Sequence, residues 1–116
     1  MDLSLETRKV NGGAVVFDLS GRLCAGESLL LLRDTVKQSV DEGVTKFVIN
    51  LGGVTYIDSS GLGELMTTYT TLQKLHGTVN LLNPSKRIRD LLQITKLLTV
   101  FNSFDDEAKA IESLQS

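Results

Sequence analysis

The chain has 116 residues, of which 41% are hydrophobic and 22% charged, a composition typical of one globular domain rather than of a disordered chain or a repeat array. Its 12 basic and 14 acidic side chains give a net charge of −2, which argues against a protein that binds nucleic acid or an anionic membrane surface. The longest aliphatic run, Leu29 to Leu32, is far shorter than the roughly 20 residues of a membrane-spanning helix, and no secretory signal is visible. With the single cysteine Cys24 no internal disulfide can form, and we expect a cytoplasmic protein.

The first half of the chain predicts a hairpin followed by a helix and a strand. Residues 3–7 alternate at the period of a strand, an Asn-Gly-Gly turn follows, and residues 14–19 are apolar enough for a second strand. Apolar residues then recur at helical spacing over about residues 25–42, with Gly43 as the C-terminal cap. The β-branched, apolar run over about residues 46–51 predicts a third, well-covered strand.

The second half continues the alternation of helices and strands. The expected elements are a helix over about residues 61–75 ended by His76-Gly77, a strand over 78–82, a helix that begins after Asn83-Pro84-Ser85, a short strand over 98–101 and a helix that begins near Ser103. Ser103 with Asp106 three residues later predicts the cap of the last helix. Strands separated by single helices imply crossover connections and parallel pairing. We therefore expect an α/β fold in one domain over residues 1–116, with a mixed, mostly parallel sheet of about five strands, opened by an antiparallel hairpin, and about four helices.

The most informative segment runs from Tyr56 to Gly63 and joins an apolar strand to an amphipathic helix through two serines. A serine at such a junction lies where backbone N–H groups lack intrahelical partners, so the fold would tolerate an added phosphate there. The simplest interpretation is that Asp58, Ser59 or Ser60 only caps the helix. Gly63, however, costs about 1 kcal/mol relative to alanine within a helix, and the close approach of another backbone or a phosphate would explain it. Ser59 is thus a candidate switch.

Other chemistries fit these residues less well. A hydrolase nucleophile needs a glycine where Ile57 stands, and the only histidine, His76, would lie about 25 Å from Ser59 along the helix. A receiver domain would accept a phosphoryl group on Asp58, but no acidic pair ends the first or second strand to hold magnesium. One cysteine and one histidine cannot build the usual metal sites. We therefore expect no catalytic residue, metal or cofactor, and we assign no role to the basic residues Lys86, Arg87 and Arg89.

Several segments together carry a resemblance to a known family. They are Leu19-Ser20-Gly21-Arg22-Leu23, Phe47-Val48-Ile49-Asn50-Leu51, Val54 to Gly63, Asn83-Pro84-Ser85, Leu91-Leu92 and Phe101. The Asp-Ser-Ser-Gly-Leu-Gly string at residues 58–63 is the specific part, since each of the other segments alone is weak. These segments resemble the STAS domain family, and within it the stand-alone anti-sigma factor antagonists of bacteria.

The resemblance implies a partner-switching protein and not an enzyme. In such antagonists the serine directly after the motif's aspartate, here Ser59, is phosphorylated by the cognate anti-sigma factor, which is a serine kinase that uses ATP. The unmodified antagonist binds the anti-sigma factor and frees a sigma factor, and the phosphorylated form is released until a phosphatase restores it. No nucleic acid or membrane partner is implied, and we expect a monomer or a weak dimer. The implied docking surface consists of Asp58, Ser59, Ser60, Gly61, Leu62 and Gly63.

The resemblance also assigns parts to single residues and leaves alternatives open. Gly61 and Gly63 would leave room for the partner's backbone, and Asp58 would hold the turn or orient the serine hydroxyl. Two positions depart from the family pattern. Cys24 replaces a common acidic residue, which puts contacts near residues 22–26 in doubt, and Lys96 replaces a glycine, where a left-handed cap costs about 1 kcal/mol. A STAS scaffold subunit of a larger signalling or transport assembly that is not switched, and a small-ligand sensor, stay open as alternatives, although no phosphate-binding loop supports the sensor.

Overall fold

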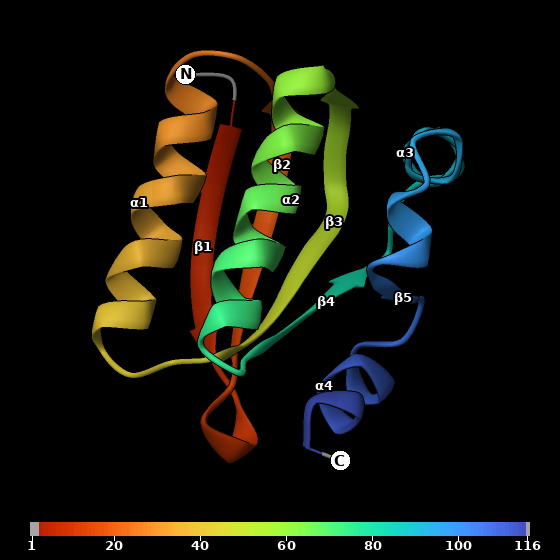
Figure 1. The fold of residues 1–116 in the computed structure, drawn as a ribbon. Helices are drawn as coiled ribbons and strands as arrows, with labels where there is room; N and C mark the ends of the chain where they lie inside the picture. Colours follow the sequence, from red (N-terminus) through yellow and green to blue (C-terminus); the bar gives the residue numbers. More distant parts are fainter. Residues whose placement is uncertain (1–2, 116) are drawn as a thin grey trace.

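The computed structural model describes residues 3–115, which form one five-stranded sheet and four α-helices (Figure 1). The strands are β1 (Leu3–Lys9), β2 (Val15–Leu23), β3 (Lys46–Ile57), β4 (Thr78–Leu82) and β5 (Asn102–Phe104). The helices are α1 (Glu27–Asp41), α2 (Ser59–Lys74), α3 (Lys86–Ile94) and α4 (Glu107–Gln115), with short 3₁₀ turns at Asn11–Gly13 and Leu97–Thr99. The strand order is β1-β2-β3-β4-β5, with β1 antiparallel to β2 and all other neighbours parallel. The predicted α/β fold with its opening hairpin is confirmed.

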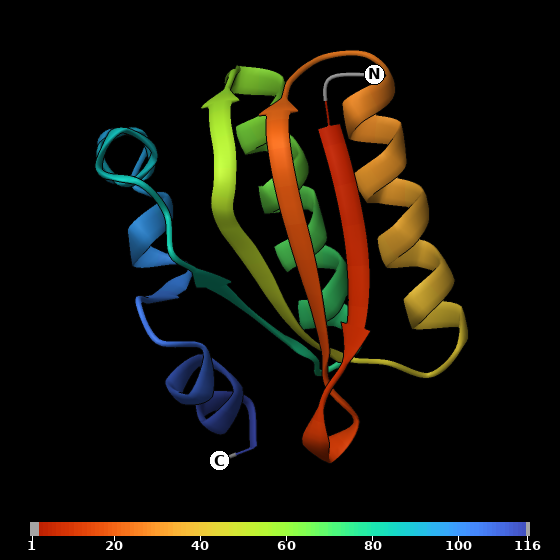
Figure 2. The same cartoon turned by 180° about the vertical axis from the view of Figure 1, so that it is seen from behind.

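Helices cover both faces of the sheet (Figures 1 and 2). The larger core lies between the sheet and α1, α2 and α3, and the smaller one lies between the sheet and α4. Successive residues of β2 alternate between them, since Phe17 belongs to the larger core and Val16 to the smaller one. The rings of Phe17 and Phe47 lie 5.2 Å apart between centroids, and each buried ring contributes about 1.5–3 kcal/mol. This two-sided burial explains why β3 is so apolar.

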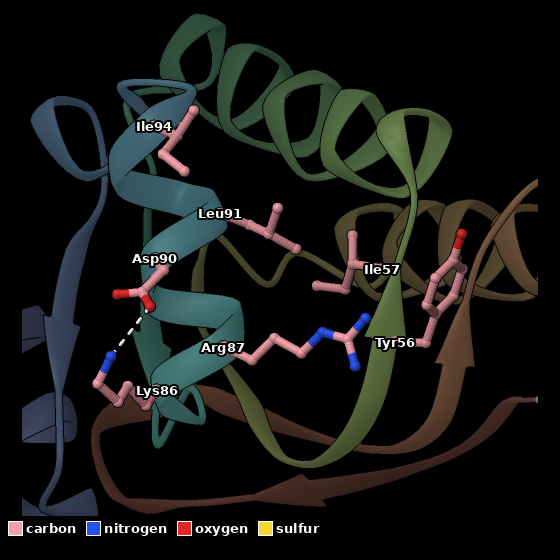
Figure 3. Close-up of a pocket in the computed structure, with 7 residues that line it drawn as sticks. All are labelled: Tyr56, Ile57, Lys86, Arg87, Asp90, Leu91 and Ile94. Carbon is pink, nitrogen blue, oxygen red and sulfur yellow. Dashed lines mark hydrogen bonds and ion pairs between the residues drawn. The ribbon is translucent and has the colours of Figure 1, made fainter.

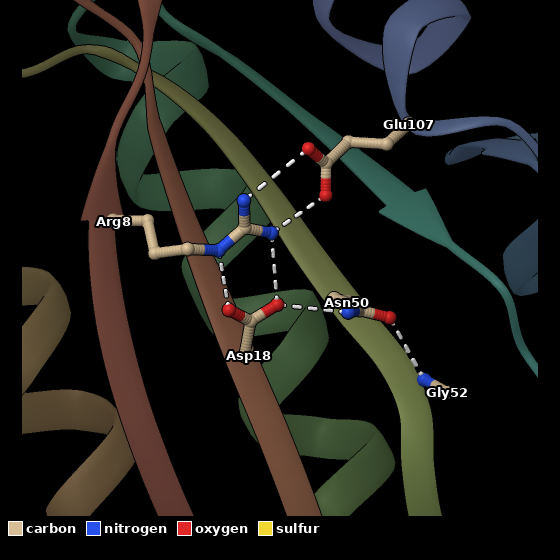
Figure 4. Close-up of polar contacts among 5 residues, drawn as sticks. All are labelled: Arg8, Asp18, Asn50, Gly52 and Glu107. Carbon is tan, nitrogen blue, oxygen red and sulfur yellow. Dashed lines mark hydrogen bonds and ion pairs between the residues drawn. The ribbon is translucent and has the colours of Figure 1, made fainter.

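A polar cluster joins the start of α4 to β1, β2 and β3 (Figure 4). The Arg8 guanidinium donates to Asp18 Oδ2 at 2.5 Å and to Glu107 Oε1 at 2.6 Å, and Asn50 Nδ2 donates to Asp18 Oδ1 at 2.8 Å. The Arg8 hydrogen bond is the main reason that the pKa of Asp18 lies below its usual value. Since these side chains are 29% to 41% exposed, solvent screens the ion pairs, and their main effect is to fix where α4 begins.

Strands β2 and β3 both run past their predicted ends at residues 19 and 51. Each supplies the other's hydrogen-bonding partners, through the parallel pairs from Ser20 with Gly53 to Leu23 with Ile57. The strands approach so closely there that a Cβ on Gly53 would lie 2.9 Å from the Leu19 carbonyl oxygen. The extension carries the ends of both strands to the edge of the sheet where α2 begins.

Two boundaries in the C-terminal part were predicted wrongly. The segment 98–101 is not a strand, because the chain turns through Leu97–Thr99 and the last strand is Asn102–Phe104. Ser103 lies within this strand, paired with Leu81, and does not cap a helix. The last helix begins at Glu107, where the Asp106 carboxylate accepts a hydrogen bond from the Lys109 N–H at 3.2 Å.

Two helices end at left-handed residues other than glycine. After α2, His76 has a φ of 57°, its N–H donates to the Gln73 carbonyl, and the Gly77 N–H donates to the Leu72 carbonyl, a Schellman arrangement. After α3, Lys96 has a φ of 64°. The left-handed cap that the sequence predicts at Lys96 is confirmed.

Candidate functional site

Asp58 is the N-cap of α2, and its carboxylate binds both the first turn of this helix and the loop between β2 and α1. Its Oδ1 accepts a hydrogen bond from the Gly61 N–H at 2.8 Å, and its Oδ2 accepts one from the Ala25 N–H at 3.1 Å. These two bonds lower the pKa of Asp58, that from Ala25 most, because they stabilise the ionised carboxylate. Two roles were predicted for Asp58, to hold the turn or to orient the serine hydroxyl. Its hydrogen bonds correspond to the first role, since they hold the turn and also attach the turn to the loop after β2.

Ser59 and Ser60 are the first two residues of α2, and both are exposed. The helix therefore begins two residues earlier than predicted, because Asp58 rather than a serine caps it. The hydroxyl groups lie in the first turn, where the positive end of the helix dipole favours anions. Ser59 directly follows the Asp58 carboxylate in the chain and is exposed to solvent.

The next three residues of the motif differ in environment. Gly61 is buried, and an added Cβ would lie 2.3 Å from the Leu23 carbonyl oxygen, so this glycine lets α2 approach the end of β2. Leu62 is only 9% exposed and belongs to the larger core. Gly63 is exposed, and an added Cβ would meet nothing within 4 Å. Packing within the described residues thus explains Gly61 but leaves Gly63 without an internal reason.

Sequence reasoning did not single out the neighbours that complete this edge of the sheet. Arg22 pairs with Tyr56 across β2 and β3, and its guanidinium lies 4.9 Å from the centre of the Tyr56 ring. In the second turn of α2, Glu64 is only 4% exposed and accepts a hydrogen bond from Arg33 of α1 at 2.7 Å. The position of Arg22 beside the motif could have been predicted, since the carboxyl ends of neighbouring parallel strands meet at one edge of the sheet. Glu64 carried no such signal.

In the described part of the chain, neither a histidine nor a cluster of metal-ligating side chains accompanies Ser59. His76 follows the far end of α2, about 25 Å from Ser59 at 1.5 Å per residue, so the serine has no histidine base. Within residues 3–115, no three His, Cys, Asp or Glu side chains come together as a metal site. None of the helices described here is long and apolar enough to cross a membrane.

Comparison with known proteins gives relatives that match almost the whole chain. The anti-sigma F factor antagonist of Paenibacillus polymyxa is 25% identical over 120 residues, which cover 99% of this chain and 97% of the relative. The solved structure of the anti-sigma factor antagonist SpoIIAA in its unphosphorylated form has 25% identity and a TM-score of 0.75, and covers 97% of this chain and 99% of the other. The Bacillus cell fate determinant SpoIIAA in its phosphorylated form has the same identity and TM-score, with coverages of 95% and 98%.

The sequence profile of the STAS domain matches residues 7–110, which include every strand except the first four residues of β1 and every residue of the Asp58 to Gly63 motif. The anti-sigma factor antagonists of this family are regulatory proteins without enzymatic activity, and this chain is likewise not an enzyme. The chain belongs to the STAS domain family.

Proposed function

We propose that this chain is an anti-sigma factor antagonist whose binding is switched by phosphorylation of Ser59. In the unphosphorylated state it binds a cognate anti-sigma factor, itself a serine kinase, and so releases a sigma factor in the cytoplasm. Phosphorylation of Ser59 by that kinase ends the interaction, and a phosphatase restores it. The observation that carries the proposal is the exposed Ser59 at the first residue of a helix whose cap is fixed by two hydrogen bonds.

Electrostatics supports release rather than recruitment of the partner. A phosphate adds about −1.5 to −2 charge, and it would do so beside Asp58, which is ionised at neutral pH and whose pKa lies below its usual value. The Gly61 N–H at the N-terminus of α2 already donates to the Asp58 carboxylate. A phosphate on Ser59 would therefore find this N–H group occupied rather than free. A partner surface that covers this patch must desolvate the added charge, and a loss of about 3 kcal/mol already weakens binding by roughly a hundredfold.

The fold need not change for the switch to act. Ser59 is exposed, and the neighbouring cap is held by backbone N–H groups of Ala25 and Gly61. Neither bond involves the Ser59 side chain, so a phosphate on its oxygen removes no contact of the core. We expect the phosphorylated chain to retain its circular dichroism spectrum and its cooperative unfolding.

The direct test is phosphorylation in vitro. Incubation of the chain with its purified anti-sigma factor and ATP should add the mass of one phosphate group, and Ser59→Ala should abolish the addition. Ser60→Ala is the matched control, because Ser60 is also exposed in the same turn, and this variant should still be modified. Tandem mass spectrometry that places the phosphate on Ser60 would refute the assignment of the residue.

Binding tests the switch itself. Unmodified chain should bind the anti-sigma factor, and phosphorylated chain or Ser59→Asp should bind roughly a hundredfold more weakly by calorimetry. Stable binding that ignores both changes would contradict switching and favour a scaffold that binds its partner constitutively.

A further inference from the structure

A groove of about 610 Å³ lies between the end of β3 and the side of α3 that faces it (Figure 3). Tyr56 and Ile57 line it from β3, and Leu91 and Ile94 line it from α3. Ile94 is 77% exposed, the largest fraction among the exposed large hydrophobic residues of the described chain. A side chain so exposed adds little to the stability of the fold, and together with the exposed Tyr56 it makes the groove apolar and open to solvent.

The groove also contains a cation without a partner. Lys86 donates to Asp90 at 3.2 Å, whereas the side chain of Arg87 has no hydrogen bond or ion pair within residues 3–115. Figure 3 shows the Arg87 side chain extended across the groove toward Ile57. Arg22 does not line the groove, but its guanidinium lies 4.9 Å from the centre of the ring of Tyr56, which does. With Lys86 and Arg87 positive and Asp90 negative, the lining of the groove carries a net charge of +1, although the whole chain has a net charge of −2.

We propose that this groove binds an acidic, apolar segment of the same anti-sigma factor that docks at Ser59, an inference that rests on the proposed function. A carboxylate of the partner meets the free guanidinium of Arg87, which is suited to bidentate binding. An apolar side chain next to it covers Ile94 and Leu91. The chemistry of the groove thus selects the partner, while Ser59 controls when it binds.

Continuity along the chain supports one partner for both places. Tyr56 and Ile57 line the groove, and Asp58 and Ser59 follow them directly. At the 3.3 Å rise of a strand residue, a partner that covers Ser59 has to extend only about 10 Å to reach the groove. A typical interface buries about 800 Å² on each side, more than the short Asp58 to Gly63 motif alone offers.

The test measures affinity for the purified serine kinase that phosphorylates this chain, using the full chain throughout. Arg87→Glu should weaken binding at least tenfold, mainly through slower association at low salt, because the charge of the groove is reversed. Ile94→Ser should weaken binding by a similar factor through faster dissociation. Both side chains are exposed, so circular dichroism and the unfolding midpoint should remain those of the unsubstituted chain.

Matched controls lie away from the groove. Lys109→Glu reverses an exposed charge on α4, on the other face of the sheet, and Leu75→Ser replaces a leucine that is 43% exposed after the far end of α2. Both controls should bind the kinase as tightly as the unsubstituted chain does.

The outcomes separate this inference from the proposed function. If Ser59→Asp abolishes binding while Arg87→Glu and Ile94→Ser leave it unchanged, the groove proposal is overturned and the switch stands. If the two groove variants weaken binding while Ser59→Asp does not, the groove is a docking site and the switch fails. Should Ile94→Ser instead dissociate a dimer in sedimentation experiments without changing the kinase affinity, the groove serves a second copy of the chain, and the proposal is wrong.

Discussion

Gly61 and Gly63 are two residues apart in the first turns of α2, yet the structure predicts opposite effects of alanine at the two positions. At Gly63 an added Cβ meets nothing within 4 Å, whereas at Gly61 it would lie 2.3 Å from the Leu23 carbonyl oxygen and 3.0 Å from Ile57 Cγ2. Both residues lie within a helix, where alanine loses less backbone freedom on folding than glycine does. The difference between the two variants therefore isolates the contact with β2.

The magnitudes follow from these contacts. Gly63→Ala should raise the free energy of unfolding by about 0.5–1 kcal/mol, which corresponds to about 2–4 °C in Tm for a chain of this size. Gly61→Ala should lower it by about 1–3 kcal/mol, because α2 and the end of β2 must move apart and the clash outweighs the gain in helix propensity. The obstacle is a backbone oxygen, which cannot rotate away as a flexible side chain could.

Urea unfolding followed by circular dichroism at 25 °C measures both values, and the method needs no tryptophan, of which the chain has none. An unchanged slope of the free energy against urea concentration would show that each variant changes stability rather than the unfolded state. A destabilised Gly63→Ala, or a Gly61→Ala as stable as the unsubstituted chain, would refute the reasoning.

The same variant tests whether Gly63 belongs to the docking surface. If the glycine leaves room for the backbone of the anti-sigma factor, Gly63→Ala should be more stable and yet bind the partner less tightly. A variant that gains stability and keeps its full affinity would remove Gly63 from the proposed surface, and the glycine would then have no explanation in the structure or in docking.

Three further predictions concern single positions. Lys96→Gly should raise the free energy of unfolding by about 1 kcal/mol in urea titrations, because glycine adopts the left-handed φ of 64° without strain. Asn80→Ala should lower it by about 1–3 kcal/mol in the same assay, because the buried Ala110 carbonyl loses the 3.0 Å hydrogen bond from Asn80 Nδ2. Asp58→Ala should cost about 1–2 kcal/mol through loss of the cap. Because the folded-state pKa of Asp58 is lowered, its contribution is present above about pH 4 and is lost as the pH falls through the folded value, so acid unfolding of Asp58→Asn should depend less on pH in this range.

The sequence predicted the order and type of the strands and α-helices because their periodicities are local. The ends of β2 and β3 could not be predicted in the same way, since Ser20-Gly21 and Gly52-Gly53 have the composition of turns. They remain extended because the two segments pair with each other, 33 residues apart for Ser20 with Gly53, and because Ser20 and Gly21 also pair with β1. Such pairing depends on contacts between distant residues and leaves no local signal.

The C-terminal boundary failed for a related reason. Ser103 with Asp106 matches the sequence pattern of a capped helix. The cap hydrogen bond, however, forms three residues later, from the Lys109 N–H to the Asp106 carboxylate. The pairing of Ser103 with Leu81 of β4 favours the later cap at Asp106, because it holds Ser103 in the edge strand β5. Strand pairing in the sheet thus outweighs the local preference of this segment for a helix start.

The site was predictable in its residues and less so in its supports. Asp58 and Ser59 stand out from their spacing, but that Ala25 binds the Asp58 carboxylate depends on the extended β2. Likewise Arg87 belonged to a basic cluster without a role, and only its lack of a partner among the described residues distinguishes it from Lys86 and Arg89, which form ion pairs.

The attachment of the Asp58 cap to Ala25 has a consequence for the speed of signalling. A binding surface that is already ordered requires no slow rearrangement before a partner binds. Association rate constants near 10⁵–10⁷ M⁻¹s⁻¹ are therefore expected, as for roughly rigid docking. Under the proposed switch, the lag between a stimulus and its transcriptional response would then reflect how quickly phosphate is added and removed, and the domain itself would contribute almost no delay.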